Sequence, residues 1–88
     1  MKRRVVVTGV GMVTPLGTGV EKNWENLLAG KSVIGPVTKF DASEYKSRIA
    51  AEVSDFTSSA FMDKQQIRRF DIFIHYGISS ARMAMEDS

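Results

Sequence analysis

The chain begins with a β-branched run that stops at a glycine-rich turn. Three valines at 5–7 follow two arginines, and Gly9 and Gly11 come directly after the run. An apolar run without polar alternation is typical of a strand that is buried on both faces, as in the centre of an α/β sheet. Glycine removes the side chain where a backbone turns or meets another backbone closely. We therefore expect a central buried strand over Val5 to Val7 that leads into a tight turn.

Two interpretations of this turn compete. Gly9-Val10-Gly11 after a strand matches the opening of the dinucleotide motif G-x-G-x-x-G. The third glycine position, however, falls on Thr14, and Pro15 keeps Thr14 out of a helical conformation. The structural interpretation is favoured, in which the glycines allow tight packing and direct the chain toward a helix that begins near Gly19. A small nucleotide-binding domain is the less favoured alternative.

Composition places the chain among ordinary globular proteins. Of its 88 residues, 43% are hydrophobic and 25% are charged, and no apolar stretch approaches the ~18 residues of a membrane span. A signal peptide is not expected either, so the expected location is cytoplasmic and no membrane partner is expected. The net charge of +2 is too small to argue for a nucleic-acid partner.

The residues needed for catalysis or metal binding are scarce. The chain has no cysteine, which fits a reducing compartment and excludes thiol catalysis, disulfides and the usual zinc sites within these residues. Its single histidine, His75, has Asp71 and Ser79 one helical turn away and lacks the partners of a catalytic base. We expect it to be a surface or helix-packing residue, and we expect no catalytic, cofactor-binding or metal-binding residue in the chain.

The pattern after the turn predicts a helix, a loop, a short strand, a short helix and a long helix. One face of the first helix, over 20–29, is apolar and carries Val20, Trp24, Leu27 and Leu28. Gly30 is its expected C-cap. The loop is expected over 31–46, an edge strand over 48–53, and the short helix from N-cap candidates at 57–59 to Arg69.

The strongest helix prediction covers residues 70–85. Apolar and small residues recur there at helical spacing, namely Phe70, Phe73, Ile74, Gly77, Ile78, Ala81, Ala84 and Met85. The polar side is expected to carry Asp71, His75, Ser79, Arg82 and Glu86. A stripe of small residues allows another element to approach closely, and it consists of Gly77, Ser80, Ala81 and Ala84.

The whole chain resembles the N-terminus of a β-ketoacyl-acyl-carrier-protein synthase, and most of all the type II elongating enzyme of bacterial fatty-acid synthesis. Polyketide ketosynthases share much of the pattern, but the stretch 40–45 favours the type II synthase. The residues that carry the resemblance are 3–17, Trp24, 27–30, Phe40, Asp41, Tyr45, Phe56, 68–71, Tyr76 and Gly77.

This resemblance implies a fold and a reaction. The fold class is α/β, and residues 1–88 are expected to be the truncated N-terminal segment of a ketosynthase N-terminal domain, an incomplete part of a thiolase-like layered fold. The reaction is decarboxylative condensation of an acyl thioester with malonyl-acyl carrier protein, without a cofactor, by a homodimeric enzyme. The cysteine and two histidines that the family uses match no residue here, so the segment alone is expected to be inactive.

A basic cluster is the one candidate site. Lys64 and Arg68 share a helical face, and Arg69 is adjacent. In the resembling synthases a basic cluster in this region docks the acidic acyl carrier protein, so the resemblance assigns carrier-protein docking to Lys64, Arg68 and Arg69. From charge alone the cluster is more typical of a solvated helix face, and only the resemblance supports a docking site. The alternative function is a non-catalytic carrier-protein-binding or partner module.

Overall fold

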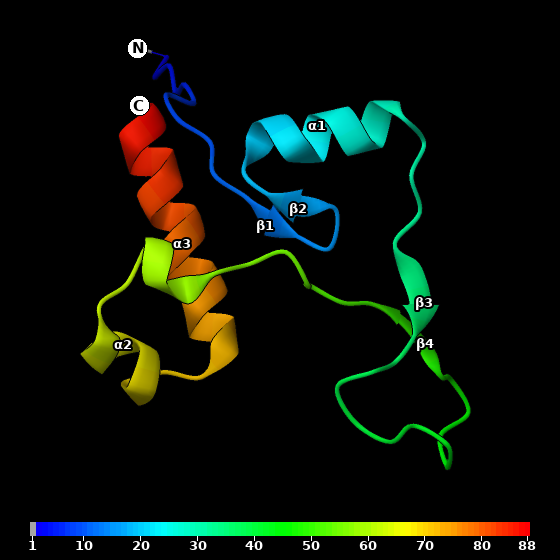
Figure 1. The fold of residues 1–88 in the computed structure, drawn as a ribbon. Coiled ribbons are helices and arrows are strands. Elements are labelled where there is room, and N and C mark those ends of the chain that lie inside the picture. Colours follow the sequence, from blue (N-terminus) through cyan, green and yellow to red (C-terminus); the bar gives the residue numbers. More distant parts are fainter. Residues whose placement is uncertain (1) are drawn as a thin grey trace. The chain divides into compact units, whose positions relative to one another are not determined.

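The computed structural model describes residues 2–88, which form two compact units (Figure 1). We call residues 13–56 the hairpin unit, because it contains two short antiparallel strand pairs. We call residues 2–12 with 57–88 the helical unit, since most of its ordered backbone is helical. The two units are described separately.

The hairpin unit begins with a tight turn at Pro15 and Leu16, a few residues beyond the glycines at 9 and 11. Strands β1 (Val13–Thr14) and β2 (Gly17–Thr18) pair antiparallel, with Thr14 opposite Gly17. Pro15 and Leu16 form the tip, where the fixed φ of proline suits the first corner of a β-turn. The turn is therefore a small hairpin that leads directly into a helix, as the structural interpretation expects.

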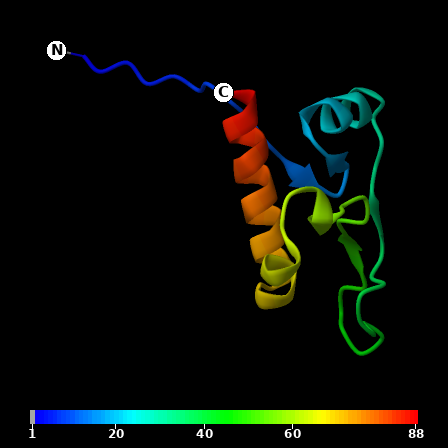
Figure 2. The same cartoon turned by 60° about the vertical axis from the view of Figure 1, so that its left-hand side comes forward.

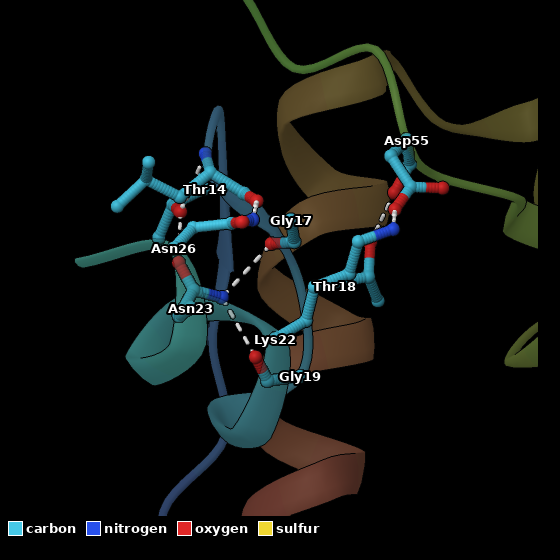
Figure 3. Close-up of polar contacts among 9 residues, drawn as sticks. Thr14, Gly17, Thr18, Gly19, Lys22, Asn23, Asn26 and Asp55 are labelled. Atoms are coloured by element: carbon cyan, nitrogen blue, oxygen red, sulfur yellow. Dashed lines mark hydrogen bonds and ion pairs between the residues drawn. The ribbon is translucent and has the colours of Figure 1, made fainter. Parts of the chain in front are cut away.

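A buried asparagine holds this hairpin against the helix (Figure 3). The side-chain amide of Asn23 donates to the carbonyl oxygens of Gly17, at 2.9 Å, and Gly19, at 2.7 Å. Its carbonyl oxygen accepts from the Thr14 hydroxyl, and Asn26 donates to the carbonyl oxygen of Leu16 at 2.6 Å. Buried polar groups are costly unless they are paired, so these bonds fix the hairpin with little apolar packing.

Helix α1 (Val20–Leu28) confirms the first predicted helix and its cap. Gly19 is the N-cap, at φ 95°, and Gly30 lies at φ 68°, a left-handed conformation that favours glycine. The amide of Gly30 donates to Leu27, and the amide of Lys31 donates to Asn26, both at 3.1 Å. This pair of bonds is a Schellman motif, which satisfies carbonyl groups at the end of the helix.

A second strand pair completes the hairpin unit. Strand β3 (Ile34–Pro36) pairs antiparallel with β4 (Ile49–Ala51), with Gly35 opposite Ala50. The predicted edge strand is confirmed, whereas the prediction of an unbroken loop over 31–46 is wrong. Local sequence could not show β3, because Gly35 and Pro36 are typical of turns and pairing with β4 outweighs their preference.

One carboxylate orders the chain after β3. The Glu52 carboxylate accepts from the Thr38 hydroxyl at 2.8 Å and from the amides of Thr38 and Lys39 at 3.1 and 3.2 Å. These bonds, above all the one from the Thr38 hydroxyl, hold the pKa of Glu52 below its ordinary value of 4.5. Further along, Asp55 pairs with Lys22 of α1 and accepts from Thr18, which ties the end of the unit to its beginning.

The helical unit contains a 3₁₀ turn η1 (Ser58–Ala60) and the helices α2 (Lys64–Arg69) and α3 (Ile72–Asp87). The long helix is confirmed. The prediction of one short helix from 57–59 to Arg69 is wrong, because the segment is divided into η1 and α2. Asp63 starts the second helix with a capping box of its own, which sequence reasoning missed although Asp63 and Gln66 have the required spacing.

The two sides of α3 are partly reversed from the prediction. His75 and Ser79, expected on a polar outer side, are only 6% and 0% exposed, whereas Phe73 is 68% exposed. The buried side meets η1 and the chain around α2, which present polar groups. The His75 ring bonds to the Ser58 hydroxyl and to the carbonyl oxygen of Phe70. Available hydrogen-bond partners, rather than hydropathy, decide which side of α3 is covered here.

The glycines at 9 and 11 lie against α3, beside its C-terminal half (Figure 1 and Figure 2). A Cβ atom on Gly9 would lie 2.1 Å from the carbonyl oxygen of Ala84, and one on Gly11 would lie 2.1 Å from that of Ser80. The amide of Val10 donates to the Asp87 carboxylate at 3.0 Å. Both the close approach expected of the glycines and the role of small residues at 80 and 84 are confirmed.

The valine run does not form the expected buried strand. Val5 is 92% exposed and Val7 is 82% exposed, and the strands found within residues 2–88 pair only β1 with β2 and β3 with β4. A strand in the centre of a sheet needs a neighbour on each side to satisfy its backbone groups. Residues 5–7 have no such neighbour in the part of the chain that is described. Also within this part, no helix is long and apolar enough to cross a membrane.

Replacing Gly11 by alanine tests the contact between the N-terminal segment and α3. The new methyl group would collide with backbone atoms, so we expect Gly11→Ala to lower the free energy of unfolding by about 1–3 kcal/mol. Gly77→Ala is the matched control, because a Cβ at Gly77 meets no atom within 4 Å. It should stabilise α3 by up to about 1 kcal/mol. Urea unfolding followed by circular dichroism measures both, and equal effects of the two substitutions would contradict the contact.

Candidate functional site

Helix α2 carries the basic cluster of Lys64, Arg68 and Arg69. Lys64 is its first residue and Arg69 its last, so the helix presents all three cations over less than two turns. All three side chains are exposed. The helical spacing that places Lys64 and Arg68 on one face is therefore confirmed.

The start of α2 explains why so short a helix forms here. The Asp63 carboxylate accepts from the amide of Gln66 at 2.9 Å, and the Gln66 side chain accepts from the amide of Asp63 at 3.2 Å. An aspartate at the N-terminus and two arginines in the last turn both suit the helix dipole. The charge of Asp63 thus serves the helix backbone and forms no ion pair with the arginines.

The side chains of the three cations have no protein partner within the described chain, where none of them forms a hydrogen bond or an ion pair with another residue. Two other cations behave differently: Lys22 pairs with Asp55, and Arg82 pairs with Glu86. A cluster of unpaired cations on one short helix creates a positive field that attracts an acidic partner.

An open depression of about 380 Å³ lies beside the cluster and is lined by Gln65, Arg68 and Arg69. Gln65 is three and four residues before the arginines, a spacing that brings the three side chains together on a helix. Sequence reasoning gives Gln65 no role, and so misses its place in the wall. Two guanidinium groups beside an amide suit the planar oxygens of a carboxylate. Lys64 does not line the depression.

The imidazole of His75 and the hydroxyl of Ser58 are the pair in this chain that most resembles a base and a nucleophile. They lie 2.8 Å apart, and the other ring nitrogen of His75 lies 2.8 Å from the carbonyl oxygen of Phe70. In a catalytic triad the third group is a carboxylate that stabilises the imidazolium, and here it is a neutral carbonyl. His75 is buried, as a helix-packing residue would be. Among the described residues, no group of metal-ligating side chains is placed to hold an ion.

The sequence of this chain matches a known protein family over almost its whole length. Residues 2–88 match the family described as β-ketoacyl synthase, N-terminal domain. The chain therefore belongs to the β-ketoacyl synthase family. A solved structure described as the ishigamide ketosynthase/chain length factor superposes on 99% of the chain with a TM-score of 0.86 and 36% sequence identity. The α/β class and the expectation of a partial ketosynthase fold are confirmed.

Named relatives also place the chain in the β-ketoacyl synthase family. The proteins called 3-oxoacyl-[acyl-carrier-protein] synthase 2 from Coxiella burnetii, Vibrio harveyi and a Synechocystis species are 52%, 46% and 40% identical to the chain over 87 residues. Each alignment covers 99% of this chain but only 21% of the relative. The chain thus spans about a fifth of the length of these relatives, and 22% of the solved ketosynthase structure.

Removing the Asp63 carboxylate tests how helix α2 is stabilised at its N-terminus. Asp63→Ala should cost about 1 kcal/mol of helix stability. The amides of Ile67 and Phe70, which bond to the carbonyl oxygens of Asp63 and Gln66 at 3.1 Å, should then exchange with solvent about fivefold faster. Asp71→Ala is the matched control, because Asp71 is the N-cap of α3 without a side-chain capping bond. Equal acceleration by both variants would contradict the capping role of Asp63.

Proposed function

We propose that these residues are the N-terminal segment of an elongating ketosynthase of fatty-acid synthesis. The observation that carries the proposal is the match to the family's N-terminal domain over residues 2–88, together with 40–52% identity to proteins named 3-oxoacyl-[acyl-carrier-protein] synthase 2. The proposed reaction is the condensation of an acyl thioester with malonyl-acyl carrier protein, with loss of carbon dioxide. Its class is acyl transfer.

In the family, the acyl group is first carried by a cysteine, and malonyl-carrier protein is decarboxylated beside two histidines. The resulting enolate attacks the acyl thioester, which adds two carbons. Residues 1–88 contain no cysteine and one histidine, so this segment does not carry these steps. We therefore assign to it a supporting role: part of the scaffold and the recognition of the carrier protein.

We propose that the basic cluster on α2 docks an acidic surface of acyl carrier protein. Three features support this: the exposure of all three cations, their lack of protein partners within residues 2–88, and the arginine-lined depression beside them. Opposite charges across such a surface mainly speed and orient encounter. The engagement of Asp63 in its own capping box supports docking over a neutralised helix face, because that carboxylate does not cancel the cluster.

The resemblance also implies a homodimer, and the sequence pattern predicts a cytoplasmic location. Both belong to this proposal. Exposed apolar residues on α1, such as Trp24 at 57% and Leu28 at 68%, support a further packing surface for this part of the chain. A non-catalytic carrier-binding module would use the same cluster but would not condense substrates.

Activity separates these two functions. We expect the complete natural polypeptide to convert acyl- and malonyl-carrier protein to a β-ketoacyl product with release of one carbon dioxide. Mass spectrometry of the carrier-bound product measures the reaction. We also expect the sequence after residue 88 to supply a cysteine and two histidines, and replacing that cysteine by alanine is the control that should abolish product. Carrier binding without any condensation would show the partner module instead.

Charge reversal tests the docking surface. In the complete polypeptide, Arg68→Glu combined with Arg69→Glu should weaken carrier-protein binding about tenfold at low salt, since two attractions become repulsions. The loss should shrink as salt rises, because exposed charges are screened. Arg3→Glu combined with Arg4→Glu is the matched control: it is an adjacent, exposed arginine pair with the same change in charge. The binding constant can be measured by calorimetry, and equal loss in both double variants would refute a specific surface.

A further inference from the structure

Helix α2 cannot fix its own orientation. It has six residues, and none of its side chains is buried. Isolated helices shorter than about 12 residues are marginal in water, because few hydrogen bonds offset the cost of ordering the first turn. The direction in which the basic cluster points therefore depends on what holds the two ends of α2.

The C-terminal end is held by His75 of α3. The Nε2 atom of the ring lies 2.8 Å from the carbonyl oxygen of Phe70, the residue that ends α2. A carbonyl oxygen only accepts, so Nε2 carries a proton, and Nδ1 lies 2.8 Å from the Ser58 hydroxyl on the other side of the ring. One buried ring thus joins the end of α2 to the start of η1.

The chain just before α2 is held from the same side of α3. The Arg82 guanidinium donates to the carbonyl oxygen of Phe61 at 2.7 Å, two residues before Asp63. Arg82 lies seven residues, about two turns, after His75, so the two side chains leave the same face of the helix. Hydrogen bonds from two side chains of α3 thus hold the chain at the two ends of helix α2.

Of the two attachments, that of His75 is the better protected from water, because its hydrogen bond to Phe70 is partly buried and the bond from Arg82 is exposed. His75 is 6% exposed, whereas the side chain of Arg82 is 55% exposed and is shared with Glu86. A hydrogen bond at a buried site is costly to leave unmade, so it restricts motion more than an exposed one.

We infer that His75 is a positioning residue for carrier-protein docking: it fixes the end of α2 through Phe70 so that Arg68 and Arg69 are held ready for the partner. The inference rests on the proposed docking function of the basic cluster. His75 would act by preorganisation, since a surface that is already ordered loses less entropy on binding. The relevant bond is the one to Phe70, because Arg69 directly precedes that residue.

Two conservative substitutions distinguish the hydrogen bond of His75 to Phe70 from its hydrogen bond to Ser58. In His75→Gln, the side-chain amide nitrogen is as many bonds from the backbone as Nε2, so it retains a donor for Phe70. In His75→Asn, the amide oxygen corresponds to Nδ1, so it retains an acceptor for Ser58 and loses the bond to Phe70. Both variants are polar and similar in size to each other.

The test measures hydrogen exchange and carrier-protein affinity on the complete polypeptide. In His75→Asn, the amides of Ile67 and Phe70 should exchange about threefold to tenfold faster, and the dissociation constant should rise about threefold or more. His75→Gln should stay within about twofold of the parent in both measurements. The amide of Ala29, which bonds to Glu25 at the end of α1, should be unchanged in both variants and reports general loss of stability.

The outcomes are distinct. Parent-like exchange and binding in His75→Asn would overturn the inference, as would equal losses in both variants together with faster exchange at Ala29. The arginine double reversal is measured in parallel: if it leaves binding unchanged, the docking proposal fails. If the reversal weakens binding and His75→Asn does not, only the positioning role of His75 fails.

Discussion

The helical unit depends on hydrogen bonds made by polar side chains along one side of α3. His75 bonds to Ser58 and Phe70 there, and Arg82 bonds to Phe61, so the whole segment between η1 and α3 is placed by hydrogen bonds. Apolar burial contributes little at this interface, where Met62, at 6% exposed, is the one large apolar residue among those described that is buried. The hydroxyl of Ser79, on the same side and 0% exposed, has no partner among the described residues. Polar interfaces of this kind specify geometry strongly, because each misplaced group costs free energy.

Sequence patterns predicted the elements whose causes are local. The apolar face and terminal glycine of α1 and the helical spacing of α3 depend on residues within four positions of each other, so both helices were found. Strand β3 and the burial of His75 depend on partners far along the chain. Pro36 and Gly35 join a strand only because β4 lies beside them, and His75 is covered only because η1 brings Ser58 to it.

The candidate site shows the same division. Helical spacing was enough to predict that Lys64 and Arg68 share a face. The expected docking role came from the resemblance to the ketosynthases, because charge alone does not indicate it. The participation of Gln65 in the depression was missed, because a neutral residue gives no signal in a charge pattern. The prediction of a buried strand over the valine run failed for a different reason. The composition of the run is typical of a central strand, but such a strand needs neighbouring strands, which residues 2–88 do not provide.

The contact between Val10 and Asp87 has a consequence for synthesis on the ribosome. The two residues are 77 positions apart, and in the sequence the hairpin unit separates the two parts of the helical unit. At roughly 5–20 residues per second, Asp87 is added about 4–15 s after Val10. The hairpin unit, whose contacts are closer in sequence, is complete well before then. The segment that contains Val10 therefore has no partner in α3 until Asp87 has been added to the nascent chain.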